Sequence, residues 1–197
     1  MTDVSAPERA LASVVVALIE RGRAFALVGG LAVSVRAEVR FTRDVDLAVA
    51  VDDDRDAEAL VRELTSIGYR AVAVVEHDTR GRLSIARLAA PGEGVMIDLL
   101  FASSGLEAEI TSRAEPMALP GIGTVPVARA EELLAMKILS MKETRLQDRL
   151  DAQRLLAMAE VDLAAVRANL ALIHARGFDR GQALDLKLQS LLDARAE

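Results

Sequence analysis

The sequence predicts a mixed fold of the α/β (α+β) class, in which helices flank a small mixed sheet and a bundle of helices follows at the C-terminus. Hydrophobic residues make up 52% of the 197 residues but aromatic residues only 3%, so we expect a core of small aliphatic side chains. Short apolar runs alternate with helical patterns up to residue 127. From residue 128, no Gly or Pro occurs before Gly177. We therefore expect a core over residues 1–127 and a helical region over residues 128–197.

The first element is expected to be a helix over residues 6–21. Leu11 and Leu18 belong to a set of apolar residues that recurs at three- and four-residue intervals, which is typical of a helix with one buried stripe. Ser5 suits the N-cap position, and Gly22 suits the position after the last turn.

A glycine pair follows the first predicted strand. The apolar run at residues 24–28 predicts this strand, and residues 31–36 predict a short helix. Gly29 and Gly30 lie between them, where a helix begins and backbone N–H groups can approach an anion closely. An ordinary turn at a strand end would need the same two residues.

The remaining elements follow from the same patterns. Residues 45–51 predict a buried strand, and residues 55–67 predict an amphipathic helix that Gly68 ends. In the rest of the core we expect strands at 69–76, 82–89 and 95–101, a short helix after Gly105, and a strand, turn and strand within 116–127. The helical region is expected to hold helices near 129–143, 146–159, 162–175 and 180–195.

Composition excludes several classes of site. The chain has no Cys and only two His, which excludes zinc ribbons, iron–sulfur sites, cysteine nucleophiles and multi-histidine metal sites. A bound metal would need carboxylate ligands and should be a hard cation. The absence of Cys fits a cytoplasmic protein, and the N-terminal apolar run at residues 11–19 is shorter than the roughly 20 residues of a membrane span. The net charge of −6 argues against a general nucleic-acid coat protein but allows a local basic patch.

Two acids at the start of an apolar strand are the most informative local feature. Asp44 and Asp46 are two residues apart, so on a strand they point to the same face. Their carboxylates repel each other there, and two divalent ions about 3.5–4 Å apart would compensate the charge. Alternatively, they lie at the exposed start of the strand and pair with Arg40 or Arg43.

Two further Asp-x-Asp pairs have a simpler interpretation. Asp52, Asp54 and Asp56 lie in a polar run directly before a predicted helix. Acids favour that position because they cap the free N–H groups and complement the helix dipole. We therefore expect these acids to lie in a solvated turn.

Asp98 is a third candidate acid, in the predicted strand at residues 95–101. If this strand lies beside Asp46, a triad of carboxylates results, in which the third acid can bind a metal and accept a proton. The alternative is an exposed position at the edge of the sheet. Neither histidine is expected to be a ligand: His77 should lie in an exposed loop, and His174 near a helix C-terminus.

These motifs together resemble a known superfamily. Gly29-Gly30, then the run from Arg40 to Leu47 (Arg-Phe-Thr-Arg-Asp-Val-Asp-Leu), then a later strand Asp is similar to nucleotidyltransferases of the polymerase-β type. Within them, the chain most resembles AbiEii-like toxins of type IV toxin–antitoxin systems. The likeness covers about residues 24–158 and implies a nucleotidyltransferase fold. At the second glycine, many members have Ser, so a hydroxyl contact to phosphate is absent here.

The resemblance implies a role for each motif. Asp44 and Asp46 would bind two Mg²⁺ (or Mn²⁺) ions, and Asp98 would bind one of them and help to activate the acceptor hydroxyl. The residues that it implies for binding an NTP such as ATP are Gly29, Gly30, Thr42, Lys137, Arg145 and Asp148. Lys137 could instead face solvent. Arg145 would share a face with Lys137 if one helix held both, since eight residues span about two turns.

The predicted reaction is transfer of an NMP from an NTP to an acceptor hydroxyl, with pyrophosphate leaving. The resemblance suggests a tRNA 3′ end or a protein as acceptor and an antitoxin as partner; no membrane partner is expected. A basic groove, for which residues 36–43 and 129–154 are candidates, would favour RNA. Acidic walls would favour a small cationic acceptor such as an aminoglycoside. A catalytically silent nucleotide- or partner-binding relative is a further alternative.

Overall fold

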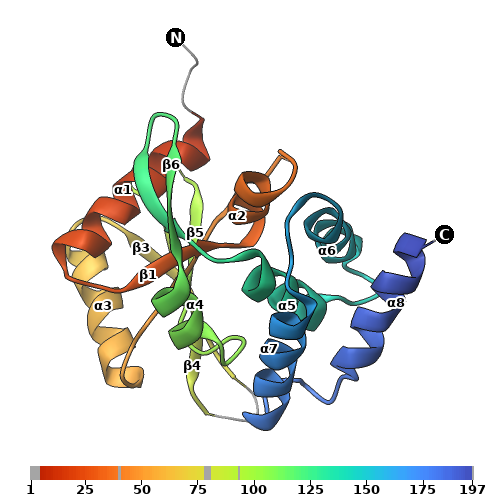
Figure 1. The fold of residues 1–197 in the computed structure, drawn as a ribbon. Helices are drawn as coiled ribbons and strands as arrows, with labels where there is room; N and C mark the ends of the chain where they lie inside the picture. Colours follow the sequence, from red (N-terminus) through yellow and green to blue (C-terminus); the bar gives the residue numbers. More distant parts are fainter. Residues whose placement is uncertain (1–4, 40, 78–80, 93, 197) are drawn as a thin grey trace.

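A computed structural model describes residues 5–39, 41–77, 81–92 and 94–196 of the chain. In this part of the chain, seven strands form one sheet in the order β3-β4-β5-β2-β1-β7-β6 (Figure 1). The strands are β1 (Phe25–Val28), β2 (Val45–Val49), β3 (Arg70–Glu76), β4 (Leu83–Ala89), β5 (Met96–Leu100), β6 (Glu115–Leu119) and β7 (Gly123–Val127). The pairs β2–β5 and β1–β7 are parallel, and the other neighbours are antiparallel. The predicted mixed sheet is therefore confirmed.

Helices surround this sheet and continue after it. They are α1 (Ala6–Glu20), α2 (Gly29–Arg36), α3 (Asp54–Ser66), α4 (Glu107–Arg113), α5 (Ala130–Ser140), α6 (Leu146–Met158), α7 (Leu163–Ala175) and α8 (Leu184–Ala196). The four helices α5 to α8 gather on one side of the strands (Figure 1). Helix α5 packs against the other three and also against α2. The last strand ends at Val127, but the division into two domains there stays a prediction.

Local signals account for the first helix and the third. Ser5 and Glu8 form a reciprocal capping box on α1, whose apolar stripe from Ala10 to Leu18 is buried. At α3, the Asp53 carboxylate accepts the Asp56 backbone N–H at 2.9 Å. The polar Asp run therefore does cap a helix, but the prediction of a solvated turn is wrong for Asp54 and Asp56, which lie in the first turn of α3 and pair with Arg82 and Arg23.

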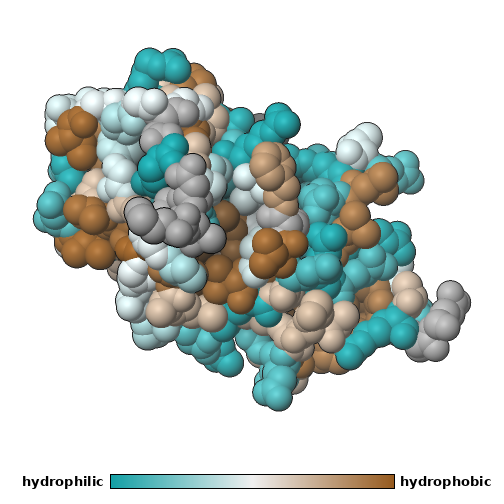
Figure 2. Space-filling model, turned by 90° about the horizontal axis from the view of Figure 1, so that it is seen from above, coloured by the Kyte–Doolittle hydropathy of each residue, from teal (hydrophilic) through white to brown (hydrophobic). Residues whose placement is uncertain are grey.

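The core consists mainly of Leu, Val, Ile and Ala side chains from both faces of the sheet. The strand β1 is buried along its whole length, and β2 at all but one position. From above, Figure 2 shows apolar and polar residues interspersed over that face. No helix in the described ranges is long and apolar enough to span a membrane.

The linker between α7 and α8 fastens the helical region to the core. Arg176 donates to both carboxylate oxygens of Glu109 on α4, at 2.6 and 2.8 Å. The Phe178 ring meets the His77 ring edge-on, with 4.6 Å between the ring centroids. The prediction of an exposed loop histidine is therefore wrong: His77 is 8% exposed, because this linker covers it.

Two predicted helix boundaries differ from the structure, each for its own reason. Helix α5 ends at Ser140 and not near residue 143, because Lys187 of α8 donates to the carbonyl oxygens of Ile138 and Met141. These are carbonyl groups that a continuing helix would have to satisfy itself. Helix α8 begins at Leu184 and not at Arg180, whose left-handed backbone (φ 56°) interrupts a helix.

Candidate active site

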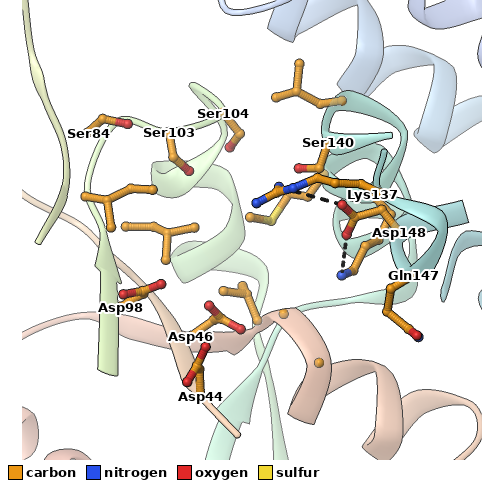
Figure 3. A pocket seen from close by; sticks show the side chains of 18 of the residues that line it. Asp44, Asp46, Ser84, Asp98, Ser103, Ser104, Lys137, Ser140, Gln147 and Asp148 are labelled. Atoms are coloured by element: carbon orange, nitrogen blue, oxygen red, sulfur yellow. Dashed lines mark hydrogen bonds and ion pairs between the residues drawn. The ribbon is translucent and has the colours of Figure 1, made fainter. Parts of the chain in front are cut away.

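A cleft of about 1150 Å³ lies between the sheet and the helical region. One side, which we call the sheet wall, carries Asp44, Asp46 and Asp98. The opposite side, the helical wall, carries Lys137 and Asp148 (Figure 3). Side chains from the two parts of the chain therefore face each other across one cavity.

Strand register brings two of the acids together. Parallel pairing of β2 with β5 places Asp46 opposite Asp98. Asp44 precedes the first residue of β2 and lines the same cleft. Strand β5 lies in the interior of the sheet, between β4 and β2, so the alternative of an edge position for Asp98 is wrong. Among the described residues, no basic side chain forms an ion pair with Asp44, and its proposed alternative partner Arg40 lies outside them.

The glycine pair packs against these acids. Antiparallel pairing places Val28 opposite Asp46, and α2 begins at the next residue, Gly29. A Cβ atom on Gly29 would lie 1.9 Å from the Asp46 Oδ2 atom, and the backbone there has a φ of +64°. Only glycine meets both requirements. The Gly30 backbone N–H donates to the Asp46 carboxylate.

Asp46 is an acid whose charge is poorly compensated. Burial, followed by the neighbouring Asp98 and Asp44 carboxylates, raises its pKa from 3.8 to about 6. The Lys137 ammonium and the Gly30 hydrogen bond oppose this shift but do not cancel it. Such a site attracts a cation, because neighbouring carboxylates repel the charge of Asp46 and no basic residue that the structure describes forms an ion pair with it.

Asp98 has a basic partner, which the sequence-based argument missed. Arg87 on β4 lies directly opposite Asp98 on β5. Its Nε and Nη2 atoms donate to the Oδ1 and Oδ2 atoms of Asp98 at 2.7 and 2.6 Å. The only signal for Arg87 in the sequence is a charged residue within the apolar run Leu-Ser-Ile-Ala-Arg-Leu-Ala.

The helical wall is organised around Lys137. Its Nζ atom lies 3.0 Å from Asp148 Oδ1 and 2.8 Å from Asp151 Oδ2. The Lys137 side chain is 12% exposed and that of Asp151 is fully buried, so the alternative of a solvent-facing lysine is wrong. Gln147 donates a further hydrogen bond to Asp151 at 2.8 Å. The acids of this wall are therefore compensated within it.

The remaining predicted residues lie at the rim of the cleft. Arg145 lines it with a side chain that is 63% exposed and lies 3.7 Å from Asp148. Since α5 ends before Arg145, this residue does not share a helix face with Lys137. Thr42 also lines the cleft, and its hydroxyl donates to the Asp44 carbonyl at 3.4 Å.

Two more basic residues line the rim, and neither was predicted as a site residue. Lys142 follows the end of α5, and Arg180 lies in the linker before α8. Both lower the pKa of Lys187, after the larger effect of burial, so the three cations lie close together. Arg180 donates to the Ser103 carbonyl at 3.1 Å. This end of the cleft is positively charged.

Carboxylate oxygens of the sheet wall suit a hard divalent cation such as Mg²⁺. Asp44 and Asp46, both partly exposed to the cleft, form no ion pair with the basic residues that the structure describes, which fits such an ion. No group of three or more His, Cys, Asp or Glu side chains is arranged to hold a metal within the ranges that the structure describes. At Asp98, Arg87 donates to both carboxylate oxygens.

The sequence from residue 9 to residue 197 matches the family model described as nucleotidyl transferase AbiEii toxin, type IV toxin–antitoxin system. No curated protein matches the sequence significantly. Among solved structures, an antigenic nucleotidyltransferase-like protein from Paracoccidioides brasiliensis is 19% identical, with 91% of this chain and 92% of that chain covered and a TM-score of 0.52. The antibiotic-resistance factor ANT(2″)-Ia is 18% identical, with 88% and 94% covered and a TM-score of 0.51. The predicted nucleotidyltransferase fold is confirmed.

Proposed function

The chain belongs to the AbiEii nucleotidyltransferase toxin family and is thus a nucleotidyltransferase. We propose that it moves an NMP from an NTP to the hydroxyl of an RNA 3′ end, in a reaction that needs Mg²⁺ or Mn²⁺. The observation that carries the proposal is the sheet wall. Asp46 lies opposite Asp98 in register, beside Asp44, and its pKa is raised to about 6 in a cleft that Lys137 faces.

In this proposal the chain positions the reactants and supplies charge. Asp44 and Asp46 would hold the divalent cation, which supplies a positive charge beside the phosphate that reacts. The beginning of α2 at Gly29 and Gly30, with the hydroxyl of Thr42, would face the triphosphate. Lys137 would contribute its charge from the opposite wall, flanked by Asp148 and Arg145.

The bond changes are those of a direct displacement. The acceptor oxygen forms a bond to the α-phosphorus, the bond from that phosphorus to the bridging oxygen of the β-phosphate breaks, and pyrophosphate leaves. Asp98 is the carboxylate that would accept the proton of the acceptor hydroxyl. No covalent enzyme intermediate is required, in keeping with the absence of Cys from the chain.

The charge of the rim favours an anionic acceptor. Lys142, Arg145 and Arg180 line the cleft outside the two walls, although Glu76 lines it as well. A polyphosphate strand would gain from these cations, whereas a cationic aminoglycoside would be repelled by them. This distinguishes an RNA acceptor from the small-molecule alternative.

Labelling tests the proposal directly. The protein is incubated with each labelled NTP, Mg²⁺ or Mn²⁺, and total tRNA, cell lysate or an aminoglycoside. Label on RNA that weakens steeply with salt supports the proposal. Label on a protein band or on the aminoglycoside would mean that the acceptor is that molecule and not RNA. Binding of NTP without transfer to any acceptor would indicate a catalytically silent relative.

The proposal extends to a cytoplasmic protein that an antitoxin partner neutralises. Expression of the wild-type chain alone should then slow the growth of its host, and Asp46→Asn should relieve that effect. Equal growth with both chains at equal protein levels would contradict the toxic role while leaving the enzymatic one open to the labelling test.

A further inference from the structure

Arg87 is placed to compete for the third carboxylate of the sheet wall. It lies on β4 directly opposite Asp98, so the backbone register alone holds the two side chains together. Both hydrogen bonds are short and charge-assisted, at 2.7 and 2.6 Å, and they engage both oxygens of the Asp98 carboxylate. This is the bidentate geometry in which an Arg–carboxylate pair is strongest.

The pairing differs from the usual support of a metal ligand. A neighbour that orients a ligating carboxylate ordinarily bonds to one oxygen and leaves the other for the metal. Here the guanidinium takes both oxygens and places a full positive charge beside them. A divalent cation at Asp98 would meet a like charge at close range, so the two cannot share this carboxylate without cost.

Arg87 is nevertheless partly exposed to the cleft. Its side chain is 43% exposed and lines the cleft, whereas the Asp98 side chain is only 11% exposed. The Asp44 and Asp46 carboxylates also attract its charge. A long, half-exposed arginine in a cleft for nucleotides can transfer its two donors to a phosphate group, for which guanidinium geometry is equally suited.

We propose that Arg87 is a positioning residue that withholds Asp98 from divalent cations until a phosphate group of the substrate draws the guanidinium away. Without a nucleotide, the sheet wall then binds a divalent cation through Asp44 and Asp46 alone. With a nucleotide, Asp98 joins them, so the complete carboxylate set forms only when there is a substrate to act on. The inference rests on the proposed function, because it assumes that the sheet wall binds cations.

Mn²⁺ binding without nucleotide tests this, with electron paramagnetic resonance to count bound ions and calorimetry to measure affinity. Arg87→Met should bind Mn²⁺ on the order of tenfold more tightly than wild type, or bind a second ion, because Asp98 is released. Arg87→Lys keeps the positive charge but cannot donate to both carboxylate oxygens as a guanidinium does, so its Mn²⁺ affinity should be intermediate. Arg82→Gln is the matched control, since Arg82 precedes β4 and pairs with Asp54 at 2.8 Å outside the cleft; it should match wild type.

Whether Arg87→Met binds Mn²⁺ more tightly or more weakly than wild type decides whether Arg87 withholds Asp98 from the cation or supports it as a ligand. If Arg87 supported a ligating Asp98, its loss would weaken Mn²⁺ binding by about 10–100-fold. Weaker or unchanged binding in Arg87→Met, with unfolding as cooperative as that of wild type, would overturn the proposal. Should Arg87→Met fail to fold, the same comparison is made with Arg87→Lys, for which unchanged or weaker binding is equally decisive.

A second measurement adds a non-hydrolysable NTP analogue. It should increase the number of Mn²⁺ ions bound per chain in wild type by more than in Arg87→Met, where Asp98 is already available. An equal increase in both proteins would contradict the proposal that Arg87 withholds Asp98 from divalent cations. Asp46→Asn separates the two hypotheses: if it still binds Mn²⁺ as wild type does, the proposed function itself is wrong. If only Arg87→Met is without effect, the further inference alone fails.

Discussion

The two walls of the cleft both carry acids, but the negative charge of these acids is compensated to different degrees. On the helical wall, Asp148 and the fully buried Asp151 share the ammonium of Lys137 at 3.0 and 2.8 Å. On the sheet wall, Asp46 forms no ion pair with a basic residue in the described ranges, and its pKa is raised to about 6. Buried acids that are paired serve the fold, whereas buried acids that repel one another indicate a missing cation. The comparison therefore separates acids that stabilise the structure from acids available for chemistry.

The largest expected effect is on the reaction. Asp46→Asn should lower nucleotidyl transfer by on the order of 10³-fold or more, because the charge that holds the cation is lost. The same change should leave the protein folded, since it removes a poorly compensated charge whose pKa is already raised. Transfer is measured with labelled NTP. Asp52→Asn, an exposed acid of another Asp-x-Asp pair, should transfer as wild type; equal activity of both variants would remove the distinction between the walls.

The helical wall should respond in stability. Lys137→Met leaves the buried Asp151 without its ammonium partner, and it should cost about 3–5 kcal/mol of unfolding free energy in a urea titration. Adding Asp151→Leu to this variant should recover a large part of the loss, because the buried carboxylate, left with only the weaker contacts to Gln147 and Arg154, is then gone. A loss below about 1 kcal/mol for Lys137→Met would mean that the helical wall does not depend on this pairing.

The pH dependence of stability sharpens the contrast. Because the pKa of Asp46 is raised from 3.8 to about 6, the folded state holds a proton that the unfolded state has lost between these values. Wild type should therefore lose stability relative to Asp46→Asn as the pH rises through this window. The difference should reach up to about 3 kcal/mol at pH 7 and vanish below pH 4, without divalent cations. Urea unfolding of both proteins across the window measures it, and a constant difference would contradict the shifted pKa.

The smallest effect distinguishes the two acids within the helical wall. Asp148→Asn should cost about 1 kcal/mol or less, because its side chain is 14% exposed and Lys137 keeps its second partner. Asp151→Asn should cost clearly more, since that side chain is fully buried. Thermal unfolding compares the two, and equal costs would show that burial does not rank them.

Local patterns in the sequence predicted much of the fold and part of the candidate site. The stripe and capping box of α1 and the Asp cap of α3 depend on residues within a few positions of one another. The acids Asp44 and Asp46, on and beside a short apolar strand, are likewise a local signal. How far the pKa of Asp46 moves depends on Asp98 of β5 and Lys137 of α5, which lie far away in the chain.

Three features escaped prediction because their causes are not local. His77 is buried by Phe178, about a hundred residues further along the chain. Helix α5 ends where Lys187 reaches its last carbonyl groups. Arg87 meets Asp98 through the register of β4 on β5, which no spacing in the sequence reveals.

By itself, the sequence determined the class of the fold and predicted the chemical type of the candidate site. The reason is that periodic apolar residues and the lack of Cys leave few other arrangements. The tertiary structure decided which carboxylates are left unpaired. Charge compensation depends on distance in space, and strand register and helix packing set that distance. Asp98 therefore pairs with Arg87 and Asp151 with Lys137, while Asp46 forms no ion pair within the part of the chain that the structure describes.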